Sequence, residues 1–291
     1  MLECVVNVSE GRQIDVLRAL RVAAGPCLLD VHSDVDHNRS VFTLAGPPEL
    51  VEEGVRSLAE ATVACLDLRL HRGVHPRIGV LDVVPFVALR PDPLDGTLAA
   101  GDPELALGAR DRFARWAGET LALPCFLYGP ERPLPQLRRQ AWRDLAPDTG
   151  PSTPHPSAGA AAVGARGVLV AYNLWLDGER LGGAGLDVAR QIATALRGPA
   201  LRTLGLAVGG SAQVSCNLIA PEQVGPADVF DAVALQAPIA RAELVGLLPR
   251  RVLLAIPRHR WDELAVGPAT TIEARLEEAG LDGGRITAHD G

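Results

Sequence analysis

Short apolar runs and helically spaced apolar residues alternate along the first half of the chain. Runs dense in branched aliphatic residues favour strands, whereas apolar residues three and four positions apart favour helices. On this basis, strands are predicted over residues 3–9, 27–32, 41–44, 80–87 (broken at Pro85) and 125–128. Helices are predicted over residues 13–24, 49–65 and 103–120, and Gly25-Pro26 is a stop signal for the first.

The second half mixes the same two kinds of segment. Strands are predicted over residues 167–176, 201–208, 213–219 and 243–248, and helices over residues 185–197, 226–236 and 270–280. Residues 130–160, rich in Pro, Gly, Ser and Arg, give the best boundary, which predicts two subdomains, 1–160 and 161–291. Because β-α-β units are mixed with hairpins in both halves, the predicted class is α+β.

Composition narrows the class of protein. The chain has 291 residues, 47% of them hydrophobic, which is typical of a globular protein with a sizeable core. It has no apolar run long enough to span a membrane and no signal-like start, so we expect a cytoplasmic protein with no membrane partner. A net charge of −7 argues against nucleic-acid binding. The five cysteines are expected to be reduced, and most of them buried.

A first polar cluster, residues 32–40 (HSDVDHNRS), directly follows a predicted strand. Strand ends that lead into polar loops often carry ligand contacts. Asp, Asn and Ser also favour ordinary solvated turns, so the cluster alone leaves both interpretations open.

A second cluster, residues 71–79 (HRGVHPRIG), holds two histidines and two arginines in an acidic chain that contains no lysine. A histidine there can take and give a proton near neutral pH, and the arginines can hold carboxylates. A basic surface loop is the alternative. His71 and His75 have the spacing of a helical zinc pair, but Gly73 and Pro76 disfavour a helix, so no metal is expected.

A third segment, residues 150–159, has glycines and prolines that would let backbone amides face a flat ligand, although a plain linker has the same composition. It contains His155. His259 and His289 have no local partners and are expected to face solvent.

Taken together, these segments resemble the formiminotransferase family, the transferase part of formiminotransferase-cyclodeaminase. The opening ECVVNVSEGR is similar to the start of that family, and HRGVHPRIGVLDVVPF at residues 71–86 is similar to its HPR segment. Further matches are LLDV with NRSV, GAR with LVAYN, QVSCNL and LVGLLP. They run in order from residue 3 to about residue 250.

The resemblance implies two α/β subdomains whose mixed sheets face each other, with helices on the outer sides and a folate tunnel between them. It also implies a homodimer and a catalytic histidine at His75. The folate-binding stretch would be Gly150, Pro151, Ser152, Thr153, Pro154, His155, Pro156, Ser157, Ala158 and Gly159. From the two polar clusters, and from Asp82 shortly after the second, we expect a substrate-binding set of His32, Asp34, Asn38, Arg39, Arg72, Arg77 and Asp82.

The implied activity is transfer of a formimino group from N-formimino-L-glutamate to tetrahydrofolate, a step of histidine degradation and one-carbon metabolism. The products would be 5-formiminotetrahydrofolate and L-glutamate, with tetrahydrofolate as co-substrate. Two alternatives remain open from the sequence: a folate-binding protein without transferase activity, and a zinc-dependent amidine or amide hydrolase.

Overall fold

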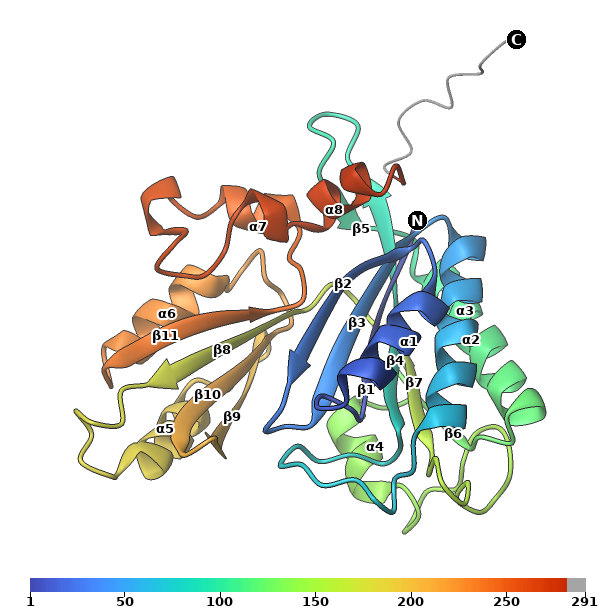
Figure 1. The fold of residues 1–291 in the computed structure, drawn as a ribbon. Coiled ribbons are helices and arrows are strands. Elements are labelled where there is room, and N and C mark those ends of the chain that lie inside the picture. Colours follow the sequence, from blue (N-terminus) through green and yellow to red (C-terminus); the bar gives the residue numbers. More distant parts are fainter. Residues whose placement is uncertain (282–291) are drawn as a thin grey trace.

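Two separate β-sheets organise the protein in the computed structural model, which describes residues 1–281 (Figure 1). His289, predicted to face solvent, lies outside the described residues. The first sheet has the order β2-β3-β1-β4-β7-β6, with β5 paired to β4. Its strands are β1 (Leu2–Val8), β2 (Leu28–Asp34), β3 (Arg39–Gly46), β4 (Leu81–Pro91), β5 (Leu98–Ala100), β6 (Cys125–Tyr128) and β7 (Ala161–Ala165).

One face of the first sheet is covered by helices α1 (Ile14–Ala24), α2 (Pro48–Cys65) and α3 (Pro103–Thr120). Alternate residues of a strand point to opposite faces. The even positions of β1 are therefore apolar and join the core under these helices, whereas Glu3 and Asn7 point to the other face. The outer face of the first sheet is thus apolar, whereas its inner face carries the polar residues of β1 beside apolar clusters around Val87 and Phe126.

The second sheet has the order β11-β8-β10-β9 and is antiparallel throughout. Its strands are β8 (Val170–Leu176), β9 (Leu201–Val208), β10 (Ser211–Leu218) and β11 (Ile239–Val245). The helices after β7 are α5 (Gly185–Ala195), α6 (Pro226–Ala234), α7 (Arg250–Leu254) and α8 (Ile272–Glu278), with short 3-10 turns at Arg258–Arg260 and Pro268–Thr270. Of these, α8 packs against the first sheet, where Ile272 and Leu276 share a cluster with Leu29 and Val87. Side chains from α5, α6 and α7 share a core with one face of the second sheet.

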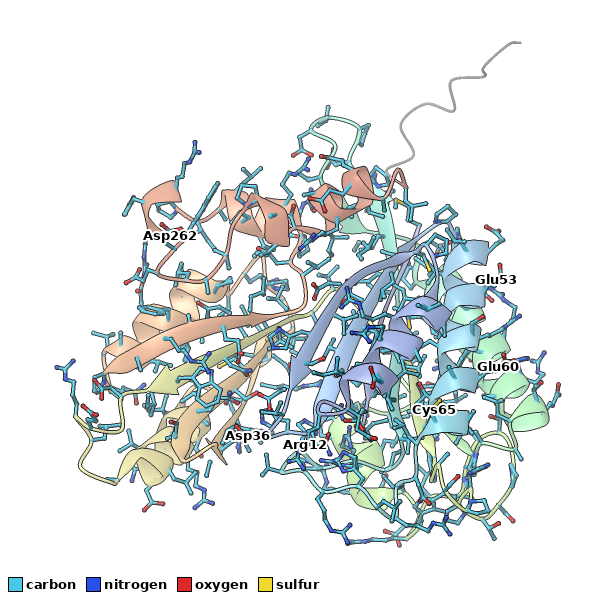
Figure 2. All side chains as sticks on the ribbon, viewed as in Figure 1. Arg12, Asp36, Glu53, Glu60, Cys65 and Asp262 are labelled. Atoms are coloured by element: carbon cyan, nitrogen blue, oxygen red, sulfur yellow. The ribbon has the colours of Figure 1, made fainter. Side chains whose placement is uncertain are left out.

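The inner faces of the two sheets approach each other at two points. His32 on β2 lies 3.6 Å from Glu243 on β11, measured from Nε2 to Oε1. Asp36, at the tip of the β2–β3 hairpin, lies so close to Gly209 that a Cβ there would come within 2.6 Å of its carboxylate (Figure 2). The inner face of the first sheet is therefore turned towards the second sheet, as the α+β prediction with facing sheets requires.

Most predicted elements are confirmed, with ends that differ by a few residues. The predicted break at Pro85 is wrong, because β4 runs through this residue. Proline has no N–H for a ladder. The ladder between β1 and β4 pairs Cys4 with Phe86 and Asn7 with Val83, and steps over Pro85, which pairs with Gly164 on the other side.

The structure also differs from the sequence expectation around residue 160. Strand β7 was not predicted, yet it lies between β4 and β6 in the first sheet, so that sheet continues past the predicted division after residue 160. Helix α4 (Leu134–Gln140) was also missed. It packs on the inner face, against Phe126 and Tyr128, and is thus an exception to helices lying on the outer sides. The other short elements that were not predicted are β5 and α7.

Among residues 1–281, no helix is long and apolar enough to cross a membrane. Cys4, Cys27, Cys125 and Cys216 are buried free thiols, as predicted, whereas Cys65 is exposed at the end of α2 (Figure 2). His259 is exposed, as predicted.

Candidate active site

A fully buried carboxylate, Asp82 near the start of β4, organises a cluster of charged residues on the inner face of the first sheet. Its Oδ2 accepts hydrogen bonds from Arg39 and Arg138, both at 2.6 Å. Its Oδ1 accepts the backbone N–H of Ile78 at 2.8 Å. Arg39 also donates to the Oδ1 of Asn7, at 3.2 Å from Nε and 2.9 Å from Nη2. One carboxylate therefore holds two guanidinium groups in place.

The charge state of Asp82 follows from these contacts. Burial alone raises the pKa of a carboxyl group, but the nearby charges of Arg39 and Arg138 outweigh it here and lower the pKa of Asp82 to about 2. Asp82 is ionised at neutral pH, and the three groups together carry one net positive charge. Asp82, a member of the predicted substrate-binding set, thus holds the side chains of Arg39 and Arg138 in place.

Side-chain hydrogen bonds to backbone carbonyls hold the loop in place before and after His75. Arg138 donates to the carbonyl of Pro76 at 3.1 Å, and the amide of Asn38 donates to the carbonyl of Arg72 at 2.9 Å. Asn38 has a positive φ of 46° and also accepts the backbone N–H of Gly11 at 2.9 Å. Asn38 thus ties the two predicted polar clusters together.

Gly73 makes the approach of these two loops possible. A Cβ at this position would overlap the carbonyl oxygen of His37 and come within 3.0 Å of the Cβ of Asn38. The space is smaller than a methyl group needs. The glycine in the HRGVHPR segment is therefore a packing requirement of the loop.

The imidazole of His75 is half-buried beside this cluster. Its Nδ1 lies 2.7 Å from the carbonyl oxygen of Pro76, and its ring lies edge-on to the ring of His37, 6.1 Å between centroids. Burial, together with the charges of Arg39 and Arg138, lowers the pKa of His75 to about 3. The ring is neutral near pH 7, so Nδ1 donates to the carbonyl and Nε2 is left as a proton acceptor.

Two further members of the predicted set shape this loop. Arg77 donates to the carbonyl of His75 and contacts the ring of His71, whose Nε2 lies 2.8 Å from the carbonyl oxygen of Asn38. Arg72 is exposed, and within residues 1–281 its side chain bonds only to carbonyls of its own turn, Arg69 at 3.2 Å and His71 at 2.8 Å. Arg72 is accordingly the member of the set most open to an incoming anion.

The two predicted residues on β2, Asp34 and His32, contact other parts of the protein. The Oδ1 of Asp34 accepts the backbone N–H groups of Asp36 and His37, and its Oδ2 lies 3.2 Å from the Nδ1 of His37. Asp34, a member of the predicted substrate-binding set, therefore stabilises the hairpin turn. The Nε2 of His37 is buried and has no hydrogen-bond partner among the described residues. His32 lies further along the inner face, opposite Glu243.

The segment 150–159 lies against the base of the His75 loop. Leu68 donates to Ser157 at 2.7 Å, Val80 donates to Ala158 at 2.9 Å, and Gly159 pairs with Gly79. The side chain of Ala158 is completely buried in the core, so it offers no surface to a flat ligand. Residues 150–154 are exposed.

Histidines and carboxylates of the two polar clusters are engaged with protein partners. His37 contacts Asp34, and His71 contacts Arg77. Within residues 1–281, no group of three or more His, Cys, Asp and Glu side chains is arranged to hold a metal ion. The arrangement provides the neutral imidazole of His75 close to the guanidinium groups of Arg39 and Arg138, which suits proton transfer on an anionic substrate.

Comparison with known proteins places this site in a family. The model of the formiminotransferase domain, N-terminal subdomain, matches residues 1–166. The chain belongs to the formiminotransferase family. The matched range ends beyond β7, so it contains the whole first sheet and every residue that surrounds Asp82.

Curated relatives of the family cover both halves of the chain. The glutamate formimidoyltransferase of Streptococcus pyogenes serotype M1 is 32% identical over an alignment 290 residues long, which covers 89% of this chain and 92% of that protein. The glutamate formimidoyltransferase of Thermoplasma acidophilum is 28% identical, over 96% of this chain and 98% of that one. The formimidoyltransferase-cyclodeaminase of Sus scrofa is 35% identical, but the chain spans only about half of its length, 51%.

Several residues of this formiminotransferase-family site were not singled out from the sequence. Arg138 was missed because it lies in the proline-rich segment 130–160, which was interpreted as a boundary. Asn7 lies in the ECVVNVS motif but had no assigned role, and Glu243 lies in a predicted strand. The usable signal for Arg138 was a pair of adjacent arginines in an apolar frame, LPQLRRQ, after Pro133.

Proposed function

We propose that this protein transfers the formimino group of N-formimino-L-glutamate to N5 of tetrahydrofolate, with His75 as general base and then general acid. The observation that carries the proposal is the neutral imidazole of His75 beside the Arg39–Asp82–Arg138 cluster, in a chain of the formiminotransferase family. Two relatives named glutamate formimidoyltransferase match nearly along their whole length.

The proposed chemistry begins with attack of N5 on the amidine carbon of the donor. A bond from N5 to that carbon forms, and His75 takes the N5 proton, which gives a tetrahedral intermediate. The bond from the carbon to the glutamate nitrogen then breaks, and the protonated His75 gives its proton to the leaving nitrogen. The products are 5-formiminotetrahydrofolate and L-glutamate, and no external oxidant or reductant is needed.

The low pKa of His75 fits this sequence when substrate charge is included. In the free protein, burial and the charges of Arg39 and Arg138 keep the imidazole neutral, ready to accept a proton. Carboxylates of the donor that bind Arg72 or Arg77 add negative charge near the ring. This raises the pKa of His75, so the imidazolium lasts long enough to protonate the leaving group.

The remaining family expectations are part of the same proposal. The first sheet with its helices acts as one subdomain and the second sheet as the other, and the ligands bind between the inner faces. The segment 150–159 contributes backbone to folate binding, because the side chain of Ala158 is turned into the core. The protein acts in the cytoplasm as a homodimer on small molecules, without nucleic acid.

The deciding experiment incubates the purified protein with formiminoglutamate and tetrahydrofolate in the presence of a chelator and follows 5-formiminotetrahydrofolate. Turnover is the expected result. Saturable tetrahydrofolate binding without turnover would favour a folate-binding protein. Release of free formamide or ammonia that needs zinc and no folate would favour a hydrolase, and either result would overturn the transferase proposal.

A further inference from the structure

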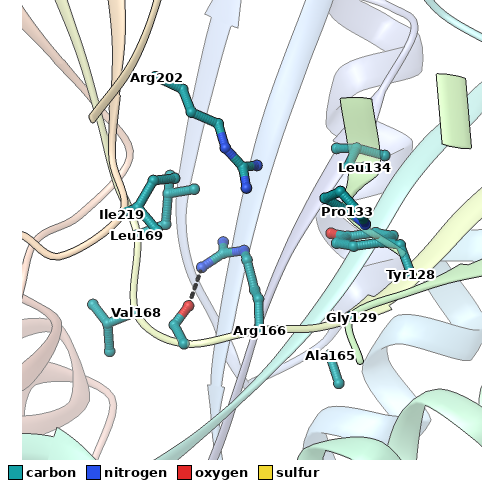
Figure 3. A pocket seen from close by; sticks show the side chains of 11 residues that line it. Tyr128, Gly129, Pro133, Leu134, Ala165, Arg166, Val168, Leu169, Arg202 and Ile219 are labelled. Atoms are coloured by element: carbon teal, nitrogen blue, oxygen red, sulfur yellow. Dashed lines mark hydrogen bonds between the residues drawn. The ribbon is translucent and has the colours of Figure 1, made fainter. Parts of the chain in front are cut away.

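A cavity of about 220 Å³ lies where the connection from β7 to β8 passes between the two sheets (Figure 3). Its walls come from both sheets and from the start of α4. The side chains that matter for its chemistry are Tyr128, Leu134, Arg166, Arg202 and Ile219. None of these residues belongs to the cluster around Asp82, so the cavity is a separate feature of the inner faces.

The walls of the cavity are held in fixed positions. The ring of Tyr128 lies over Gly164, so closely that a Cβ at Gly164 would overlap it. The backbone N–H of Arg166 donates to Phe86 at 3.1 Å, and its Nη1 donates to the carbonyl of Gly167 at 2.8 Å. Arg202, on β9, pairs with Asn217 on β10. Both guanidinium groups point into the same space (Figure 3).

Two positive groups that share one space favour an anion between them. Neither Arg166 nor Arg202 has an ion-pair partner among residues 1–281. The charge of Arg166 acts on Glu3, a buried residue of β1. Burial raises the pKa of Glu3 to about 7 against the opposing charge of Arg166, so this carboxyl group only partly offsets the arginines near neutral pH.

The rest of the lining is apolar. Pro133, Leu134, Val168, Leu169 and Ile219 surround the guanidinium groups, and the ring of Tyr128 closes one side. A ligand that suits these walls carries a carboxylate on an aromatic or aliphatic body. A fully hydrated inorganic anion would leave the apolar surface unused.

The cavity and the His75 site are neighbours on the same surface. Leu134 faces the cavity, and Arg138, one turn later on α4, bonds to Asp82. Along β4, Val83 follows Asp82, and the carbonyl of Phe86 holds Arg166. Asp82 and Phe86 are four residues apart on the strand, which corresponds to roughly 13 Å. A carboxylate in the cavity is therefore well separated from a group that reacts at His75.

This separation distinguishes the two substrates of the proposed function. The carboxylates of formiminoglutamate lie within a few bonds of its reacting nitrogen, so they belong near Arg72 and Arg77. In tetrahydrofolate, a p-aminobenzoyl ring separates N5 from the glutamate. We propose that Arg166 and Arg202 bind the glutamate carboxylates of tetrahydrofolate, with the aminobenzoyl group along the apolar wall. This inference rests on the proposed function.

The test combines one substitution with one change in the ligand. The diamide of tetrahydrofolate replaces both glutamate carboxylates by uncharged carboxamides. Calorimetry measures Kd for tetrahydrofolate and for the diamide, with wild-type protein and with Arg202→Gln, without any donor. The side chain of Arg202 is exposed and has no hydrogen-bond or ion-pair partner among residues 1–281, so the variant is expected to fold. Arg115→Gln, at an exposed position on the outer helix α3, is the matched control.

The wild-type protein is expected to bind tetrahydrofolate roughly ten- to hundredfold more tightly than the diamide. Arg202→Gln should lose most of that preference, and Arg166→Gln likewise, whereas Arg115→Gln should keep it. No preference in the wild type, or an unchanged preference in both cavity variants, overturns the inference. A rise in KM for formiminoglutamate alone, with tetrahydrofolate binding unchanged, would also overturn it.

Failure of the proposed function can be distinguished from failure of the cavity assignment. If the wild type shows no formimino transfer, the binding comparison still reports on the cavity, because it needs no donor. If transfer occurs but the diamide binds as tightly as tetrahydrofolate, only the assignment of the cavity is wrong.

Discussion

Arg138, on the short inner helix α4, forms an ion pair of 2.6 Å with Asp82, a carboxylate that is fully buried at the base of the His75 loop. The same guanidinium donates to the carbonyl of Pro76, the residue after His75, at 3.1 Å. Arg138 thus connects a helix of the 130–160 segment with the backbone beside the proposed catalytic ring. We interpret Arg138 as a positioning residue.

Arg138→Gln is expected to lower kcat by about 10- to 100-fold, because small displacements of a reacting group have effects of this size. The protein should remain folded, since Asp82 keeps Arg39, although it should lose about 1–3 kcal/mol of stability. The charge of Arg138 also lowers the pKa of His75. Removing it should therefore raise the pKa of His75, which an NMR titration of the histidines measures.

The neighbouring residue supplies the control. Arg139 is exposed on the same helix and has the same charge. Arg139→Gln should leave kcat and the pKa of His75 unchanged. If both variants behave alike, or if Arg138→Gln changes stability without moving the pKa of His75, Arg138 does not position the site.

The residues of this candidate site that the sequence singles out lie in two dense motifs. His75, Arg77 and Asp82 fall within one stretch, and Asn38 and Arg39 within another. What brings the stretches together is the pairing of β1 with β3 and β4, which a linear pattern does not reveal. Arg138 depends on such long-range packing alone.

Two local features also misled the prediction. Proline suggested an irregular segment at residues 130–160, but Pro135 lies in the first turn of α4, where a missing N–H does not matter. The run Ala160-Ala161-Ala162-Val163-Gly164-Ala165 has a weak strand propensity. It forms β7 because its small residues fit between β4 and β6, and Gly164 leaves room for Tyr128.

His75→Ala is expected to reduce turnover by about 10²- to 10⁴-fold, the usual contribution of a general acid–base group. The fold should be retained, because the ring is half-buried and its side-chain hydrogen bond is to the adjacent Pro76. Steady-state kinetics with both substrates measure the effect. His259→Gln, at an exposed position, should match the wild type. Turnover of His75→Ala within a few-fold of wild type, in folded protein, would remove His75 from the mechanism.

Gly73→Ala tests whether the two polar loops must touch. The added methyl group would overlap the carbonyl oxygen of His37 and force the His75 loop away. We expect a loss of stability of about 1–3 kcal/mol and at least about a tenfold loss in kcat/KM. Gly178→Ala, where no atom lies within 4 Å of the added methyl, should change stability by less than about 0.5 kcal/mol. Equal behaviour of the two variants in urea unfolding would contradict the packing argument.

The contact between the sheets at His32 and Glu243 should make stability depend on pH. The contact with Glu243 raises the pKa of His32 above its ordinary value of 6.5. Burial raises the pKa of Glu243, but bonds from His32, Asn173 and Trp175 outweigh it and lower that pKa from 4.5 to about 2. The stabilisation from His32 is complete below its ordinary pKa and is lost as pH rises through the higher folded value. That from Glu243 is present above its ordinary pKa and is lost as pH falls towards about 2.

The contribution of this ion pair is therefore greatest between the two ordinary pKa values, about 4.5 and 6.5. Urea unfolding of wild type and Glu243→Gln should show a larger difference in free energy at about pH 5.5 than at about pH 8.5. Glu179→Gln, at an exposed position, should show no such pH dependence. In an NMR titration, Glu243→Gln should lower the pKa of His32. A difference in stability that is the same at both pH values, with an unmoved His32 titration, would mean that the pair does not join the sheets in solution.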